Sequence, residues 1–151
     1  HRRIALLAGP PGEDPHPIRR GRKMARAFEE ALAAHAAATD PRYVRFVDQT
    51  EEAAEEAVAE LLRLAPRPTA LLVAGDQLAT GARRAARRCG VRVPEELALA
   101  VYADSEEQPG AVAVKPLREM GEQAVRMLAR EMDGKPAPRG GRCRVLRPAL
   151  L

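Results

Sequence analysis

Short apolar runs alternate with amphipathic helical patterns along this 151-residue chain, and no other feature constrains its fold as strongly. Each run is bounded by proline, glycine or polar residues, which is typical of strands buried on both faces of a sheet. Strands that alternate with helices predict a parallel sheet whose right-handed crossovers place helices on both faces. We therefore predict an α/β fold with a doubly wound parallel sheet, whose strands are Arg3–Ala8, Tyr43–Val47, Ala70–Ala74 and Leu97–Tyr102.

Helical patterns follow the first three runs. The first covers about residues 18–37, where apolar residues recur at three- and four-residue spacing. Thr50 is placed to cap the second helix, and Asp76 is the expected cap of the third. In that third helix we expect Cys89 to face the core and the paired arginines to form a solvated outer face.

The C-terminal part has a different pattern. A short strand is predicted at Val112–Val114, and Pro116 then opens a long amphipathic helix. A linker rich in proline, glycine and arginine leads to a last strand near Arg144–Leu146. The helix has an apolar stripe formed by Leu117, Met120, Ala124, Met127, Leu128 and Met132.

The charge balance is basic, with a formal net charge of +4 at pH 7. A nucleic-acid surface is one interpretation, and a genome rich in G and C, whose codons favour arginine, is the other. We favour the second because the arginines are interleaved with Glu and Asp and lack stacking aromatic partners. No apolar run approaches the ~20 residues of a membrane span, so we expect no membrane partner.

The sequence offers few residues that could form a metal, cofactor or catalytic site. Cys89 and Cys143 are far apart and the histidines are scattered, so we expect no metal, no cofactor and a reducing compartment. The segment Gly9–Gly12 lacks the Lys and Ser or Thr of a phosphate-binding loop and is followed by acids. Ser105 is the only serine and has no GxSxG context, so we predict that the chain is not an enzyme.

In an open α/β sheet, ligands bind beyond the carboxyl ends of the strands. This rule selects the loops that follow the four predicted strands. We therefore expect any binding site to be built from residues 9–17, 48–50, 75–77 and 103–107.

Four stretches of the chain resemble the LacI/GalR family of transcriptional regulators. Pro68–Ala82 is similar to the family's P-T-A-[IL]-x-x-x-N-D-x-x-A-x-G-A pattern, and Gly90–Leu97 to G-x-x-V-P-x-D-[IV]. Val114–Gly121 is similar to V-x-Q-P-x-x-x-[ML]-G, and His1–Pro10 to a strand in the middle of the regulators' core. The resemblance implies a periplasmic-binding-protein-like core, in which two α/β lobes close on a small effector, often a sugar or purine.

The resemblance also implies a domain division and partners. Residues 1–111 would form the C-terminal effector-binding lobe, residues 112–134 a segment of the other lobe, and residues 135–151 a linker and returning strand. The DNA-binding headpiece lies outside this sequence, so DNA would be bound only through that headpiece. A cytoplasmic homodimer is expected.

Seven positions correspond to the family's effector contacts. Three of its polar groups are replaced: an arginine by Met24, an asparagine by Gly75 and an aspartate by Ala103. Shifting the first helix by a turn would put Arg20 or Arg22 in place of Met24. A polyol site needs charged or amide groups, so we expect a degenerate or altered effector site, with the retained aspartates holding loops. The seven ligand-binding candidates are Met24, Gln49, Gly75, Asp76, Ala103, Asp104 and Lys115.

Two other protein classes remain open at this point. One is a solute-binding protein of a sugar transporter with the same fold, although the chain starts without a secretory signal. The other is an α/β enzyme, which would require a catalytic group of residues that the sequence does not present.

Overall fold

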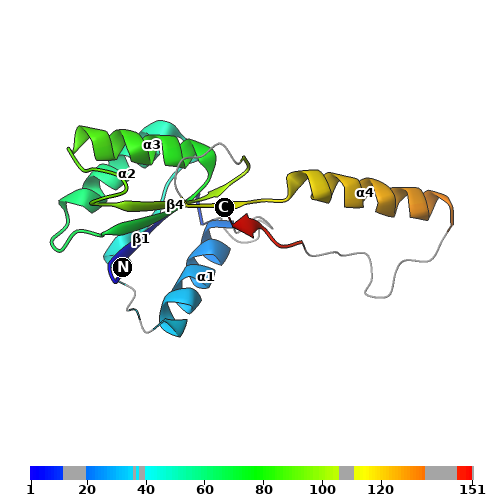
Figure 1. Ribbon diagram of the computed structural model, residues 1–151, viewed down its shortest axis with the longest axis horizontal. Coiled ribbons are helices and arrows are strands. Elements are labelled where there is room, and N and C mark those ends of the chain that lie inside the picture. Colours follow the sequence, from blue (N-terminus) through cyan, green and yellow to red (C-terminus); the bar gives the residue numbers. More distant parts are fainter. Residues whose placement is uncertain (12–19, 36, 38–39, 106–110, 135–145, 151) are drawn as a thin grey trace.

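The computed structural model describes residues 1–11, 20–35, 37, 40–105, 111–134 and 146–150 (Figure 1). The strands are β1 (Ile4–Ala8), β2 (Val44–Phe46), β3 (Ala70–Ala74), β4 (Ala98–Ala103), β5 (Ala111–Val114) and β6 (Ala149–Leu150). The helices are α1 (Arg20–Ala34), η1, a 3-10 turn (Pro41–Tyr43), α2 (Glu51–Arg63), α3 (Asp76–Arg88) and α4 (Leu117–Met132).

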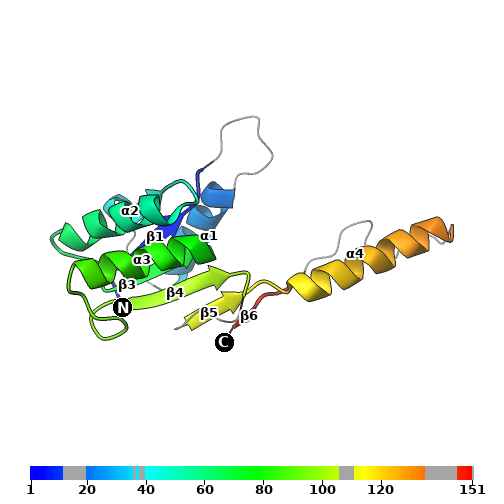
Figure 2. The same ribbon diagram turned by 90° about the horizontal axis from the view of Figure 1, so that it is seen from above.

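The sheet has the strand order β2-β1-β3-β4-β5-β6, and β1 to β5 are parallel. Only β6 is antiparallel among the described strands, and it pairs with β5. Helix α1 covers one face of the sheet, whereas α2 and α3 cover the other (Figures 1 and 2). The predicted doubly wound α/β fold is confirmed, because helices lie on both faces of a parallel sheet.

Two hydrophobic clusters lie on opposite faces of the sheet. Successive side chains of a strand point to opposite faces, so Leu6 of β1 packs with Phe28 and Leu32 of α1, whereas Leu7 faces the larger cluster. That larger cluster lies beneath α2 and α3 and includes Val73 and Leu78. β1 is therefore buried on both faces, as its continuous apolar run predicts.

Helices α2 and α3 pack closely at Gly81. A Cβ atom there would lie 2.2 Å from the carbonyl oxygen of Glu51, so only glycine allows this approach. Arg84 pairs with Glu51 at 2.7 Å, and Arg88 pairs with Glu55 at 2.7 Å, both across the two helices. Arg84, Arg87 and Arg88 are exposed, as predicted for a solvated face, and the acids of α2 neutralise two of them.

The ends of the helices match the sequence predictions in one case and differ in two. Thr50 caps α2, and its hydroxyl accepts a hydrogen bond of 3.2 Å from the Ala53 amide. The N-cap of α3 is Gly75, so Asp76 is the first helical residue and not the cap. Cys89, predicted to face the core, is the exposed C-cap of α3, and the buried side chain of Val91 covers the core there.

The C-terminal part contributes a strand to the sheet and then leaves it. β5 pairs with β4, so residues 111–114 extend the sheet of the first segment, while the wider division into lobes stays a prediction. The last strand, β6, lies at Ala149–Leu150 and not near Arg144–Leu146, where it was predicted. Leu146 is outside any strand, and residues 144–145 lie outside the described residues. In the part that the structure describes, no helix is long and apolar enough to span a membrane.

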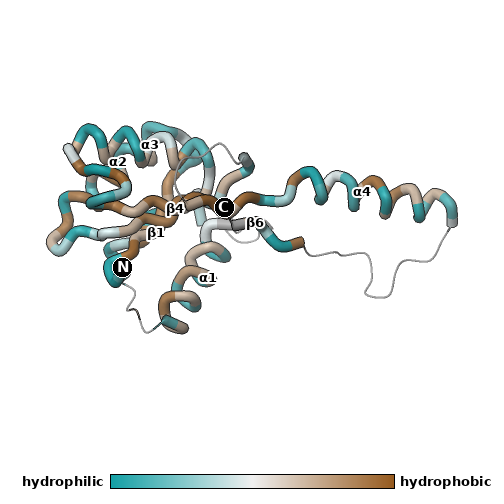
Figure 3. Tube along the Cα trace, viewed as in Figure 1, coloured by the Kyte–Doolittle hydropathy of each residue, from teal (hydrophilic) through white to brown (hydrophobic). Residues whose placement is uncertain are grey.

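Helix α4 projects away from the sheet, and apolar and polar residues alternate along it (Figures 2 and 3). None of its residues is buried. The exposed fractions of Leu117, Leu128 and Met132 are 47%, 61% and 86%. The predicted apolar stripe therefore exists, but no described segment of the chain covers it.

The turn before β4 is held by Glu96. Its carboxylate accepts hydrogen bonds from the side chain of Arg92 at 3.0 Å, from the Arg92 amide at 3.2 Å and from the side chain of Arg67 at 3.1 Å. These bonds, with the side chain of Arg92 first, lower the pKa of Glu96 to about 2. The structure thus favours the ionised form of this side chain.

We predict a pH-dependent contribution of Glu96 to stability. Because its pKa falls on folding, the stabilisation is complete above the unfolded value of about 4.3 and is lost as the pH falls toward about 2. Urea denaturation should give the wild type a larger free energy of unfolding than Glu96→Gln at about neutral pH. The two values should converge as the pH falls to about 2, the pKa of Glu96 in the folded protein. Glu60→Gln, at an exposed position of α2, controls for the loss of one negative charge. A difference for Glu96→Gln that stays constant over this range would contradict the prediction.

Candidate functional site

The carboxyl ends of the parallel strands meet at one edge of the sheet, and the four predicted loops all begin there. β2 lies on one side of β1, while β3, β4 and β5 lie on the other. The direction of winding therefore reverses between β1 and β3, and a crevice for ligands is expected at such a switch point. We call the described residues at this edge the strand-end cluster, which consists of Gly9, Gln49, Gly75, Asp76, Asp104 and Lys115.

Gln49 lies between the two glycines that end β1 and β3. A Cβ atom on Gly9 would lie 2.1 Å from the Gln49 amide nitrogen, and one on Gly75 would lie 3.1 Å from its amide oxygen. Gly75 also has a φ of +136°, a backbone conformation that other residues rarely adopt. Both glycines make room for Gln49, whose exposed amide is thereby placed at the switch point.

This arrangement explains why an asparagine would not fit at Gly75 without other changes. Its Cβ would strain the backbone and press on the Gln49 side chain. The resemblance to the family pointed to both positions but not to their contact, because the residues lie in different loops.

Asp76 connects the loops that follow β3 and β4. Its Oδ2 accepts a hydrogen bond of 2.9 Å from the backbone amide of Asp104, which supports the loop-holding role predicted for it. Its Oδ1 is buried and has no hydrogen-bond donor in the described part of the chain. An unpaired buried carboxylate oxygen is unfavourable, so a donor from a ligand or water would stabilise it.

Lys115 connects the ends of β4 and β5. Its Nζ forms an ion pair with Asp104 and lies 5.0 Å from the centroid of the Tyr102 ring, within the range of a cation–π interaction. Its backbone amide donates a hydrogen bond of 3.0 Å to the carbonyl of Ala103. The sequence analysis did not identify Tyr102, because nothing in the strand pattern distinguishes it from a packing residue.

Two other predicted site residues have packing positions. Met24 is half-buried and packs against the smaller hydrophobic cluster beneath α1. The side chain of Ala103 is 0% exposed within the larger cluster, so it presents no surface to a ligand and only its carbonyl faces Lys115. Arg22 is exposed on α1, and the side chain of Arg20 lies outside the described residues.

The chemistry of the strand-end cluster suits binding more than catalysis. It offers an amide from Gln49, a buried acceptor from Asp76 and an ammonium group from Lys115, whose charge Asp104 partly neutralises. Residues 12–17 and 106–107, which belong to two of the predicted loops, lie outside the described residues.

Comparisons with known proteins agree with this geometry. Residues 1–148 match the family of periplasmic binding protein-like domains. The HTH-type transcriptional repressor CytR of Escherichia coli (strain K12) is 31% identical over 147 residues, which make up 94% of this chain and 42% of CytR. A regulatory protein of the LacI family from Chloroflexus aggregans has a crystal structure that is similar at a TM-score of 0.85 and 26% identity, covering 99% of this chain and 53% of that one.

The structure of a transcriptional regulator CelR–cellobiose complex is also similar, with a TM-score of 0.79 and 30% identity. The match covers 100% of this chain and 46% of that one. The chain thus spans about half the length, or less, of the relatives it matches. The chain belongs to the family of periplasmic binding protein-like domains, and it corresponds to part of the effector-binding core of LacI-family transcriptional regulators.

Proposed function

We propose that the chain is a ligand-sensing part of a cytoplasmic LacI-type transcriptional regulator, which binds DNA only through a headpiece outside this sequence. The observation that carries the proposal is the strand-end cluster, whose polar groups meet at the switch point where such a fold binds ligands. The relatives of the chain reported above are named as regulators. This favours a regulator over the two alternatives, a solute-binding protein of a transporter and an α/β enzyme.

The effector site is proposed to be altered. Met24 and Gly75 stand where the family has an arginine and an asparagine, and Ala103 replaces an aspartate. The structure supports the alteration, since Met24 packs in a core cluster and Ala103 is buried. The remaining charged groups are Lys115, which pairs with Asp104, and Asp76, whose buried Oδ1 has no donor among the described residues. They suit an effector that carries both an anionic group for Lys115 and a hydrogen-bond donor for Asp76.

We predict that the complete regulator binds ordinary sugars weakly or not at all. Each lost hydrogen bond to a charged group costs about 1.5–3 kcal/mol, so three losses would weaken a micromolar site beyond useful affinity. Calorimetry with pentoses, hexoses and disaccharides, cellobiose included, measures this. Micromolar binding that Gln49→Ala abolishes and the exposed Glu60→Gln leaves unchanged would contradict the prediction.

Specific DNA recognition is expected to require the headpiece. Regulators of this kind read bases with a headpiece helix in the major groove, and the headpiece is proposed to lie outside this sequence. A gel-shift experiment with this chain should show at most weak binding that disappears at physiological salt. Sequence-selective binding that persists at that salt concentration would overturn the proposal for this chain.

The apolar stripe of α4 predicts self-association. Each large apolar side chain left in water forgoes about 1.5–3 kcal/mol of stabilisation, and the stripe includes Leu117, Leu128 and Met132. Light scattering should report a dimer for this chain, and Leu128→Glu should shift it toward the monomer. Arg126→Glu, on the same helix and also exposed, is the matched control. A clean monomer for the wild type at high micromolar concentration would contradict the prediction.

A further inference from the structure

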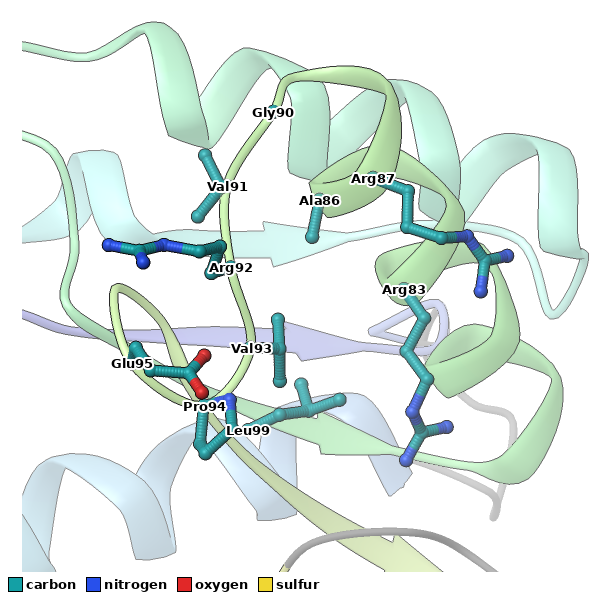
Figure 4. Close-up of a pocket in the computed structure, with 10 residues that line it drawn as sticks. All are labelled: Arg83, Ala86, Arg87, Gly90, Val91, Arg92, Val93, Pro94, Glu95 and Leu99. Atoms are coloured by element: carbon teal, nitrogen blue, oxygen red, sulfur yellow. The ribbon is translucent and has the colours of Figure 1, made fainter.

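A cavity lies at the opposite end of the sheet from the strand-end cluster. It is bounded by the C-terminal half of α3 and by the loop of residues 90–95 that leads into β4 (Figure 4). Its volume is about 760 Å³, which falls within the range of small-molecule sites. No function described above uses this cavity.

The cavity has an apolar floor and a cationic wall. Val91, Val93, Pro94 and Leu99 supply the apolar surface, and Val93 is 38% exposed although it is a large hydrophobic residue. Arg83 and Arg87 both extend from α3 along the same side of the cavity, whereas Arg92 and the cavity's acidic residue, Glu95, lie on the other side (Figure 4). Arg92 is also engaged by Glu96, so the positive charge is concentrated on the α3 side.

Arg87 differs from its neighbours Arg84 and Arg88 on α3. Arg84 and Arg88 are neutralised by acids of α2. Arg83 and Arg87 are one helical turn apart, a spacing at which like charges repel. Burial, and then the charge of Arg87, lower the pKa of Arg83, and within the described residues no carboxylate forms an ion pair with Arg87. An anion placed beside Arg87 would offset this repulsion.

We propose that the cavity is an accessory binding site for a small amphipathic anion. The apolar body of the ligand packs on Val93, Pro94 and Leu99, and its carboxylate or phosphate is held by the guanidinium group of Arg87. The proposal does not depend on the effector site. Helix α3 runs from Asp76 in the strand-end cluster to Arg87 at this cavity, so one rigid element would join the two sites.

Titration calorimetry on the whole chain tests the site with matched probes. 4-Phenylbutyrate and phenyl phosphate carry both an apolar body and an anionic head, 4-phenylbutan-1-ol lacks the charge, and acetate and inorganic phosphate lack the body. We expect either amphipathic anion to bind at least about tenfold more tightly than the alcohol or the small ions, because both parts of the ligand contribute. Equal binding of acid and alcohol, binding by the small ions as tight as by their phenyl counterparts, or no binding at all would overturn the proposal.

Two variants place that binding in the cavity. Arg87→Gln should weaken probe binding by about tenfold or more, since a charge-assisted hydrogen bond is lost. Val93→Asn should also weaken it, because a polar side chain then replaces part of the apolar floor. Arg63→Gln, an exposed arginine at the end of α2, should leave it unchanged. Far-ultraviolet circular dichroism and the urea midpoint establish that each variant folds. If Arg87→Gln changes the oligomeric state and leaves probe binding unchanged, the cavity is an interface between copies of this chain and the proposal is wrong.

Discussion

The burial of β1 on both faces is the constraint on which the rest of the structure depends. Leu6 and Leu7 point to opposite sides of the sheet and are both fully buried, so helices must cover both sides. Covering both sides with right-handed crossovers requires the winding to reverse beside β1. That reversal separates the loops after β1 and β3 and creates the position that Gln49 occupies. A requirement of core packing thus fixes where a ligand can bind.

Periodicity in the sequence was sufficient to predict the five parallel strands, the four long helices, the fold class and the edge of the sheet that holds the candidate site, but not the position of β6. These features depend on residues close together in the chain. The contact of Gln49 with Gly75, the pairing of Arg84 with Glu51 and the burial of Ala103 were not predicted, because each depends on how separate elements pack. Cys89 illustrates the same limit, since its helical phase favours burial but the helix ends one residue earlier.

The arginines of α3 show how one helix can serve different surfaces. Those facing α2 form ion pairs that join the two helices, with modest effect on stability because the side chains are partly exposed. Those on the other side, Arg83 and Arg87, face a cavity with an apolar floor. Composition alone gives the net positive charge but does not distinguish a charge that stabilises packing from one available to a ligand.

Lys115 connects the site to the part of the chain that leaves the sheet. It is the last residue before Pro116, the N-cap of α4, and its side chain is held by Asp104 while its amide is held by the end of β4. Asp104 is in turn held by Asp76, so two consecutive polar contacts join the start of α3 to Lys115 beside α4. An anionic ligand that competes with Asp104 for Lys115 would weaken the last of these contacts. Since a ligand shifts an equilibrium only through differential contacts with its two states, this ion pair is the contact that the proposed effector would perturb.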